Sequence, residues 1–388
     1  MNNNWQRVKL DDVCDLIAGF AFKGKDFGEE FQSKVIKIAD IQPPNVKMDS
    51  LTGIDVSKYD ESKLQKYRVG IGDYVFAMTG ATIGKLGRIQ EGEAYINQRV
   101  LTFRNNLNVC DKDFLYYVLA QPSFLGYILN HIDSETAQPN ISASSVGTFE
   151  FYLPPISTQK QIANALRGLD DKIELNNKIN RNLEAQAQAI FKSWFIDFEP
   201  FKNSKFIDSE LGKIPEGWDI GTIGDISIIS TGKRPDKKSV NKSNETPIPI
   251  IGASSIMGYT NKVLYDEKIL ITGRVGTHGI IQKIDSPCWP SDNTLVLRSK
   301  NLNFLHNCLL LINWKSMNRG STQPLITQND LKNIRIILPQ DGIIQNYEQL
   351  VHYFDIKFHN NNKEIYSLSQ IRDLLLPKLM SGEVNISD

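Results

Sequence analysis

The stretch Gln138-Pro139-Asn140-Ile141-Ser142 recurs 185 positions later as Gln323-Pro324-Leu325-Ile326-Thr327. The same shift brings Asn176-Asn177-Lys178 onto Asn361-Asn362-Lys363, and eleven of the 46 aligned positions that start at Gln138 are identical. Chance at one in twenty per position gives only about two or three identities. The chain therefore contains an internal repeat.

Nearer the start of the chain the shift becomes 213. Trp5 and Gly19 then match Trp218 and Gly232. The change of shift means that the middles of the two halves differ by insertions and deletions. The sequence predicts four blocks, which are a variable block 1–155, a constant block 156–200, a variable block 201–340 and a constant block 341–388.

The constant blocks show the heptad pattern of long helices, in which apolar residues alternate at spacings of four and three. A single stripe of this kind is typical of an amphipathic helix that lies on its own domain. Here both copies share one register, and the polar residues Asn176 and Asn361 fall at the same position, which favours a coiled coil between them. Because each helix follows a globular block, we expect antiparallel pairing. The predicted seam is Ile162, Leu166, Leu169, Ile173, Asn176, Leu183, Ile190, Val351, Phe354, Phe358, Asn361, Ile365, Leu368 and Leu375.

Local signals predict where these helices begin and end. Thr158 fits a capping box at the start of the first helix, and Pro200 is expected to stop it. Pro377 should kink the second helix, and Ser381-Gly382 should end it.

The variable blocks read as mixed α/β domains. Short runs rich in β-branched residues predict strands, and two longer stretches predict helices. The predicted fold is therefore two α/β domains joined by two long helices that pair as an antiparallel coiled coil, with an internal pseudo-two-fold repeat. The predicted strands are 35–38, 74–78, 100–103, 269–272 and 294–297, and the predicted helices are 111–131 and 302–318.

Composition excludes several classes of protein. The chain has 388 residues, of which 41% are hydrophobic, and 44 basic residues balance 44 acidic ones. No apolar run approaches the roughly 18 to 20 residues of a membrane span. The four cysteines are far apart and the start lacks a signal-peptide pattern, so we expect a cytoplasmic protein. The block 201–340 carries 18 basic and 12 acidic residues, which leaves it locally basic.

Motifs for catalysis are weak. Gly80-Ala81-Thr82-Ile83-Gly84-Lys85 has one residue too few between its glycines for a phosphate-binding loop. Asp236, Asp266 and Lys268 resemble a metal-dependent nuclease pattern, in which carboxylates hold magnesium and a lysine assists a water. That pattern has no equivalent in the first half. The histidines are scattered singly, and no metal site is predicted.

Basic, polar loops at matching places in the two halves favour DNA as a partner. Lysine and arginine contact phosphates or guanine edges, whereas asparagine and glutamine read adenine. The alternative is a solvated surface loop. The candidate DNA-binding residues are Lys23, Lys25, Arg99, Lys233, Arg234, Lys237, Lys238, Arg274, His278 and Arg319.

The sequence resembles the specificity subunits of type I restriction–modification systems over nearly its whole length. The resemblance depends on motifs that occur in a fixed order and, in part, twice. These are Ile214-Pro215-Glu216-Gly217-Trp218, Leu153-Pro154-Pro155-Ile156-Ser157-Thr158-Gln159-Lys160-Gln161-Ile162-Ala163, the stretch from Ala189 to Pro200 and the stretch from Leu374 to Glu383.

The resemblance implies that each variable block is a target-recognition domain for one half of a bipartite, asymmetric DNA site. The coiled coil would set the gap and dock two methyltransferase subunits, and restriction subunits would join the complex. No catalysis is implied for this chain. S-adenosylmethionine, ATP and magnesium are expected on the partner subunits, with no cofactor in this chain. The second half departs from the pattern at Gln340-Asp341-Gly342, and Arg372 interrupts the apolar seam, where we expect a partner contact. A metal-dependent nuclease and a coiled-coil scaffold that binds only protein are the alternatives.

Overall fold

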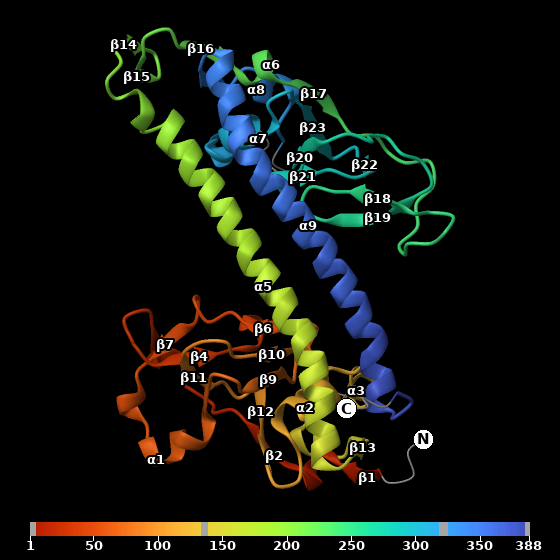
Figure 1. Cartoon of the computed structure of the whole chain (residues 1–388). Coiled ribbons are helices and arrows are strands. Elements are labelled where there is room, and N and C mark those ends of the chain that lie inside the picture. Colours follow the sequence, from red (N-terminus) through yellow and green to blue (C-terminus); the bar gives the residue numbers. More distant parts are fainter. Residues whose placement is uncertain (1–4, 133–138, 318–324, 385–388) are drawn as a thin grey trace. The chain divides into compact units, whose positions relative to one another are not determined.

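The computed structural model describes residues 5–132, 139–317 and 325–384, and the chain divides into two compact units. Unit 1 contains residues 1–175 and 364–388, and unit 2 contains residues 176–363. Each unit combines one α/β domain with half of both long helices, α5 (Ile156–Phe195) and α9 (Asp341–Met380), which Figure 1 shows as unbroken coils. The four blocks predicted from the sequence differ from this division, because the halves of each helix pack in different units.

Unit 1 is built on a sheet with the strand order β2-β12-β9-β10-β6-β5. Every residue of β9 is buried, as expected for a central strand that is covered on both faces. A second sheet has the order β3-β7-β4-β11-β8, and β1 pairs with β13. The strands are β1 Gln6–Lys9, β2 Cys14–Ala18, β3 Phe27–Gly28, β4 Lys34–Ile36, β5 Ile41–Gln42, β6 Asn45–Val46, β7 Thr52–Ile54, β8 Arg68–Gly70, β9 Tyr74–Ala77, β10 Leu86–Arg88, β11 Glu93–Ile96, β12 Val100–Asn105 and β13 Glu150–Leu153, and the helices before α5 are α1 Glu61–Leu64, α2 Lys112–Ala120, α3 Pro122–Asn130 and α4 Ala143–Gly147.

Unit 2 repeats this plan with shorter additions. Its central sheet has the order β17-β23-β20-β21, a smaller sheet has the order β19-β18-β22, and β16 pairs with β24. The hairpin of β14 and β15 follows α5. The strands are β14 Phe206–Ser209, β15 Gly212–Pro215, β16 Asp219–Thr222, β17 Ile228–Thr231, β18 Ile248–Ile251, β19 Ile256–Thr260, β20 Ile269–Gly273, β21 Gln282–Ile284, β22 Trp289–Pro290, β23 Thr294–Arg298 and β24 Arg335–Leu338, and the helices before α9 are α6 Ile223–Ile226, α7 Leu302–Leu310 and α8 Gln328–Lys332.

The predicted fold class and internal repeat are confirmed. α5 and α9 begin and end 185 positions apart, as do β13 and β24, while β1 and β16 are 213 positions apart. The offset falls from 213 to 185 along the chain because the second sheet of unit 1 is larger than the second sheet of unit 2. Gln138, Gln323 and Pro324 of the repeated motif lie outside the described residues, but Ile141 and Ile326 donate equivalent backbone hydrogen bonds to Met78 and Arg274.

All five predicted strands are present, although the first ends at Ile36 because a 3-10 turn begins at Ile38. The two predicted domain helices are shorter than expected. The stretch 111–131 is divided into α2 and α3, because Gln121 takes an extended conformation before Pro122. In the stretch 302–318, α7 ends at Leu310 and a short 3-10 turn follows at Trp314–Met317. Residue 318 lies outside the described part of the chain.

The ends of α5 differ from the prediction, whereas α9 ends directly before Ser381-Gly382, as predicted. α5 already begins at Ile156, so Thr158 lies inside the helix and is not its cap. The helix ends at Phe195, before Pro200, and Phe198 then turns the chain with a φ of 53°. α9 continues through Pro377 to Met380, and Gly382 follows with a φ of 70°, a left-handed conformation that glycine adopts without strain.

Polar contacts show that α5 and α9 pair antiparallel in unit 1. Asp170 Oδ1 of α5 accepts a hydrogen bond from Arg372 Nη1 of α9 at 2.9 Å. Farther along α5, Lys172 forms an ion pair with Glu364, at an earlier position on α9. Arg372, at which the sequence predicted a contact with a partner protein, is thus engaged within its own unit.

The same direction holds in unit 2. Asn361 Nδ2 donates to Asn180 Oδ1 at 2.8 Å, and the rings of Phe191 and Tyr347 lie 5.9 Å apart. Asn180 and Asn361 therefore bond across the helix pair instead of facing solvent. Of the predicted seam, Ile162, Leu166, Asn176, Val351 and Asn361 are buried, and Leu169, Ile173, Leu183, Ile190, Phe354, Phe358, Ile365, Leu368 and Leu375 are half-buried.

The asparagine pair gives a first prediction. Replacing Asn361 by leucine leaves the Asn180 oxygen without its amide donor, although Asn180 stays only 7% exposed. We expect Asn361→Leu to lower the free energy of unfolding by about 1–3 kcal/mol, the cost of a buried unsatisfied polar group. The double variant Asn180→Leu/Asn361→Leu should recover most of that loss, whereas Asn182→Ala on the exposed face should change little. Guanidinium unfolding of the three variants tests this, and an unrecovered loss in the double variant would contradict it.

Candidate nucleic-acid interface

Three loops of unit 1 leave its central sheet at the same end. Ala18, the last residue of β2, pairs with Leu101 of β12, and Ala77, the last residue of β9, pairs with Val100. The loops after β2, before β12 and after β9 therefore meet. We call residues 19–26, 78–85 and 97–99 the loop edge of unit 1.

Unit 2 has a loop edge at the equivalent place. Thr231, the last residue of β17, pairs with Leu295, and Gly273, the last residue of β20, pairs with Thr294. The loop edge of unit 2 consists of residues 232–247, 274–281 and 291–293. The candidate residues other than Arg319 thus lie at corresponding ends of two equivalent sheets.

A tight turn at the centre of each loop edge is held by backbone contacts. In unit 1 the amide of Val100 donates to Asn97 O at 2.8 Å, and in unit 2 that of Thr294 donates to Ser291 O at 3.0 Å. A Cβ on Gly19 would lie 2.2 Å from Asn97 O, and one on Gly232 would lie 2.1 Å from Ser291 O. Both glycines, matched by the 213 shift, are required because the turn carbonyl approaches the backbone so closely.

The residues inside these turns have exposed polar side chains, and the hydrogen bonds described above hold their backbone in place. They are Gln98 and Arg99 in unit 1, and Asp292 and Asn293 in unit 2. Such groups offer the donors and acceptors that read base edges, and a rigid support favours selective contacts. Of these four only Arg99 was a sequence candidate. For Gln98, Asp292 and Asn293, the only indication in the sequence was the match of Gly19 with Gly232, the glycines that contact these turns.

Lys23 and Lys25 lie exposed on the loop edge of unit 1, on a segment held by the half-buried Tyr59 and the buried Asp26. The amide of Lys23 donates to the Tyr59 hydroxyl at 3.0 Å, and that hydroxyl donates to Asp26 Oδ2 at 2.6 Å. The hydrogen bond from Tyr59, together with Lys58, lowers the pKa of the Asp26 carboxyl, which therefore stays ionised. These hydrogen bonds fix the backbone that carries Lys23 and Lys25.

An aromatic cluster, which the sequence did not reveal, supports the same segment. The ring of Phe20 lies 5.0 Å from that of Phe22 and 5.4 Å from that of Tyr59, and Phe22 also contacts Tyr95. Tilted and edge-on aromatic pairs of this kind add to the stabilisation from burial. The loop is thus an ordered platform.

In unit 2 the basic run is anchored at its start. The amide of Lys233 donates to Pro290 O at 2.9 Å, and its carbonyl accepts from Trp289 Nε1 at 2.6 Å. Lys233, Arg234 and Lys238 are exposed and make no ion pair with any carboxylate in the described part of the chain. Lys237 differs, because it pairs with Glu245 at 3.0 Å.

The remaining candidates occupy less exposed places. The half-buried Arg274 follows β20, and its amide donates to Asn293 O at 2.8 Å. His278 is half-buried, and its Nδ1 lies 3.0 Å from Gly276 O. Arg319 lies outside the described residues.

A hollow opens on the loop edge of unit 2. The hydroxyl of Ser291, at 4% exposure, lines it and has no hydrogen-bond partner among the described residues. A hollow with cations, a free hydroxyl and amide groups suits a phosphate oxygen or the edge of a base. Its lining residues are Arg234, Pro235, Lys238, Ile250, Met257, Ser291, Asp292 and Asn293.

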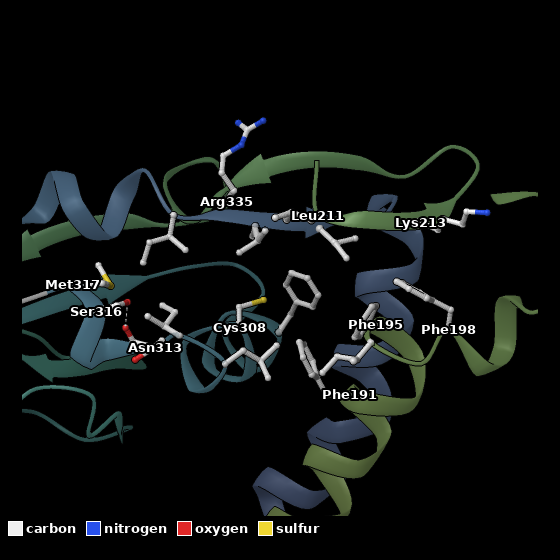
Figure 2. Close-up of a pocket in the computed structure, with 17 residues that line it drawn as sticks. Phe191, Phe195, Phe198, Leu211, Lys213, Cys308, Asn313, Ser316, Met317 and Arg335 are labelled. Carbon is white, nitrogen blue, oxygen red and sulfur yellow. Dashed lines mark hydrogen bonds between the residues drawn. The ribbon is translucent and has the colours of Figure 1, made fainter. Parts of the chain in front are cut away.

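A second pocket, which is apolar, lies elsewhere in unit 2 between the end of α5, α7 and β24. Figure 2 shows Phe191, Phe195 and Cys308 together, whereas Arg335 points away from the cavity. Arg335 Nε donates to Glu210 at 2.6 Å, and burial raises the pKa of the Cys308 thiol, which therefore stays protonated. The lining offers apolar contacts instead of an activated nucleophile.

The residues of the nuclease-like pattern do not form a metal-binding group. Asp236 accepts from Lys262 at 2.7 Å, which lowers the pKa of its carboxyl, whereas Asp266 and Lys268 lie exposed. Within residues 5–132, 139–317 and 325–384, no three histidine, cysteine or acidic side chains are grouped so that they could hold a metal ion. Nor does any helix in these ranges have the length and apolar character to cross a membrane.

Comparisons with known proteins agree with this geometry. The model of the type I restriction modification DNA specificity domain matches residues 2–185 and again residues 215–369. The MjaIX type I restriction enzyme specificity subunit of Methanocaldococcus jannaschii is 31% identical over 313 residues, which are 72% of each chain. The HindI specificity subunit of Haemophilus influenzae is 24% identical over 74% of this chain and 81% of its own.

Among solved structures, the S subunit of a type I restriction–modification system from M. genitalium is similar in fold. Its TM-score is 0.58 at 18% identity, with 100% of this chain and 98% of that chain covered. The double match of the family model falls on the two halves that carry equivalent loop edges. The chain belongs to the type I restriction–modification DNA specificity family.

Proposed function

We propose that this chain recognises DNA for a type I restriction–modification complex, with each α/β domain reading one half of a bipartite site. The observation that carries the proposal is the duplication of the loop edge. Two equivalent sheets present a rigid polar turn beside unpaired, exposed cations. One such surface would serve many ligands, but two unequal copies on one chain fit an asymmetric site with two halves.

The two kinds of side chain have different tasks in this proposal. Lys23, Lys25, Lys233, Arg234 and Lys238 contact phosphates, which position the domain without reading sequence. The turn residues Gln98, Arg99, Asp292 and Asn293 contact base edges, because amide, guanidinium and carboxylate groups each distinguish bases in the major groove.

The proposed partners are double-stranded DNA, two methyltransferase subunits that dock on the helix pair, and restriction subunits. S-adenosylmethionine, ATP and magnesium would be bound by those subunits, where they supply the methyl group and drive cleavage. This chain would supply recognition without catalysis. The proposal places its action in the cytoplasm, where host DNA is found.

Charge removal on the loop edge tests the proposal. In the complex with methyltransferase subunits, Lys233→Ala/Arg234→Ala should weaken binding to a duplex with the cognate site. The slope of log affinity against log salt should fall by about 0.9 for each phosphate that the variant no longer neutralises. The order of preference among half-site sequences should stay the same, because phosphate contacts carry no sequence information.

The matched control is Lys202→Ala/Lys205→Ala, which removes the same charge from exposed lysines outside the loop edge. Its salt slope should equal that of the unmodified chain. Equal slopes for all three proteins would contradict DNA contact at this loop edge.

A further inference from the structure

In unit 1 one carboxylate joins three elements at the junction between the α/β domain and the helix pair. Asp170 of α5 accepts from the Tyr117 hydroxyl of α2 at 2.7 Å and from Arg372 of α9 at 2.9 Å. Tyr117 is 1% exposed. Burial and the neighbouring Asp170 raise the pKa of the Tyr117 phenol, so it stays protonated and donates its hydrogen bond.

A second carboxylate extends this junction into the sheet. Asp113 of α2 accepts from Arg167 of α5 at 2.6 Å and pairs with Arg88 of β10 at 3.1 Å. The Arg88 guanidinium lies 4.2 Å from the centre of the Tyr116 ring. Hydrogen bonds therefore link α2 to α5 and α5 to α9, and the ion pair of Arg88 joins the sheet to this junction.

Unit 2 has a junction at the equivalent place, made with other residues. Asp355, 185 positions after Asp170, accepts from Asn303 Nδ2 of α7 at 2.7 Å. Lys283 of β21 donates to Asn303 Oδ1 at 2.7 Å and lies 3.5 Å from Asp355. Glu348 of α9 accepts from Asn303 and from the first turn of α7. The arrangement recurs although most of its residues differ.

These junctions lie at the far end of each sheet from the loop edge. Arg88 pairs with Tyr74, the first residue of β9, and Lys283 pairs with Leu270 near the start of β20, whereas the loop edges follow the ends of these strands. The six residues of β12 span about 20 Å at about 3.4 Å each. A tilt of about 10° at the junction would move the loop edge by about 3.4 Å, the rise of about one base pair.

From this geometry we infer that the two junctions fix how far apart the half-sites must lie, with Asp170 and Asp355 as positioning residues. This rests on the proposed function. Apolar packing alone would hold each domain on the helices but allow small tilts, because it is not directional. A hydrogen-bonded polar contact specifies one arrangement. The gap would thus depend on the tilt of each domain as well as on the length of the helices.

The experiment measures binding of the complex with methyltransferase subunits to duplexes whose half-sites are separated by the native gap, or by one base pair more or less. We expect Tyr117→Phe, Asp170→Asn and Asp355→Asn each to reduce the preference for the native gap by about fivefold to tenfold, the value of one or two hydrogen bonds. The preferred half-site sequences should not change. A merely structural role would weaken binding to all three duplexes alike.

Lys172→Gln is the matched control, because it removes the exposed pair with Glu364 between the long helices and leaves the domain contacts intact. Its gap preference should equal that of the unmodified chain. Thermal unfolding shows which variants fold. If Asp170→Asn does not fold, Tyr117→Phe still tests the inference, because it removes only one oxygen atom. If the folded variants keep the gap preference of the unmodified chain, the inference is wrong but the proposed function still stands. An unmodified chain that shows no bipartite preference overturns the proposed function instead.

Discussion

Inserting seven residues into both α5 and α9 should move the preferred gap between half-sites by about three base pairs. Seven helical residues add about 10 Å, and DNA rises about 3.4 Å per base pair. The insertions belong directly after Leu183 and directly before Phe358, because the contacts Asn180–Asn361 and Phe191–Tyr347 show that these points face each other within unit 2. Both seams keep their heptad register.

On the native site we expect binding to fall by about 100-fold or more, because only one half-site can be engaged at a time. Affinity should return on a duplex with the longer gap and the same half-sites. Seven residues inserted after Ser204, in the exposed segment before β14, form the control and should leave the gap unchanged. A variant with paired helices that still prefers the native gap would contradict the role of the helices as a spacer.

Asn293→Ala should relax specificity at one or two positions of a single half-site. Asn293 is exposed within the turn that is held by the Thr294–Ser291 hydrogen bond, and its loss removes donors and acceptors without disturbing that backbone bond. A bidentate base contact discriminates by about 1–3 kcal/mol, so the preference at the affected position should fall by about fivefold to 150-fold. Binding to duplexes with every single-base change in both half-sites measures this.

Arg99→Ala in the turn of unit 1 is the matched variant and should relax the other half-site only. Asn182→Ala, on the exposed face of α5, should change neither. If Asn293→Ala and Arg99→Ala relax the same half-site, the assignment of one half-site to each domain is wrong. If neither variant alters any position, the turns do not read bases.

Much of the fold could be predicted because the strongest signals are periodic and occur twice. The heptad seam sets the two long helices, and the 185 shift brings α5 onto α9 at both ends. Local signals were less reliable. Thr158 has the chemistry of a cap but lies inside α5, because packing of the start of that helix into the domain core overrides this preference.

The candidate interface could be predicted only in part, because its features join residues that are distant in the sequence. The basic run at Lys233 could be found by its charge, but its anchoring to Trp289 and Pro290 could not. Asn293 sits in a polar turn that has no motif, and its role depends on where β20 and β23 end. The sequence showed only that Asp170 recurs in the second half of the repeat. Its contact with Tyr117 could not be predicted, because Tyr117 lies on another helix.

A map of methylated bases across the genome of the host, with and without this gene, tests the central claim most directly. The account predicts that deletion removes methylation from one motif made of two different half-sites at a fixed gap, and that reintroducing the gene restores it. The Asn293→Ala gene should restore the motif with one half relaxed. Methylation of that motif that persists unchanged in the deletion strain would contradict the claim that this chain directs the complex to its site.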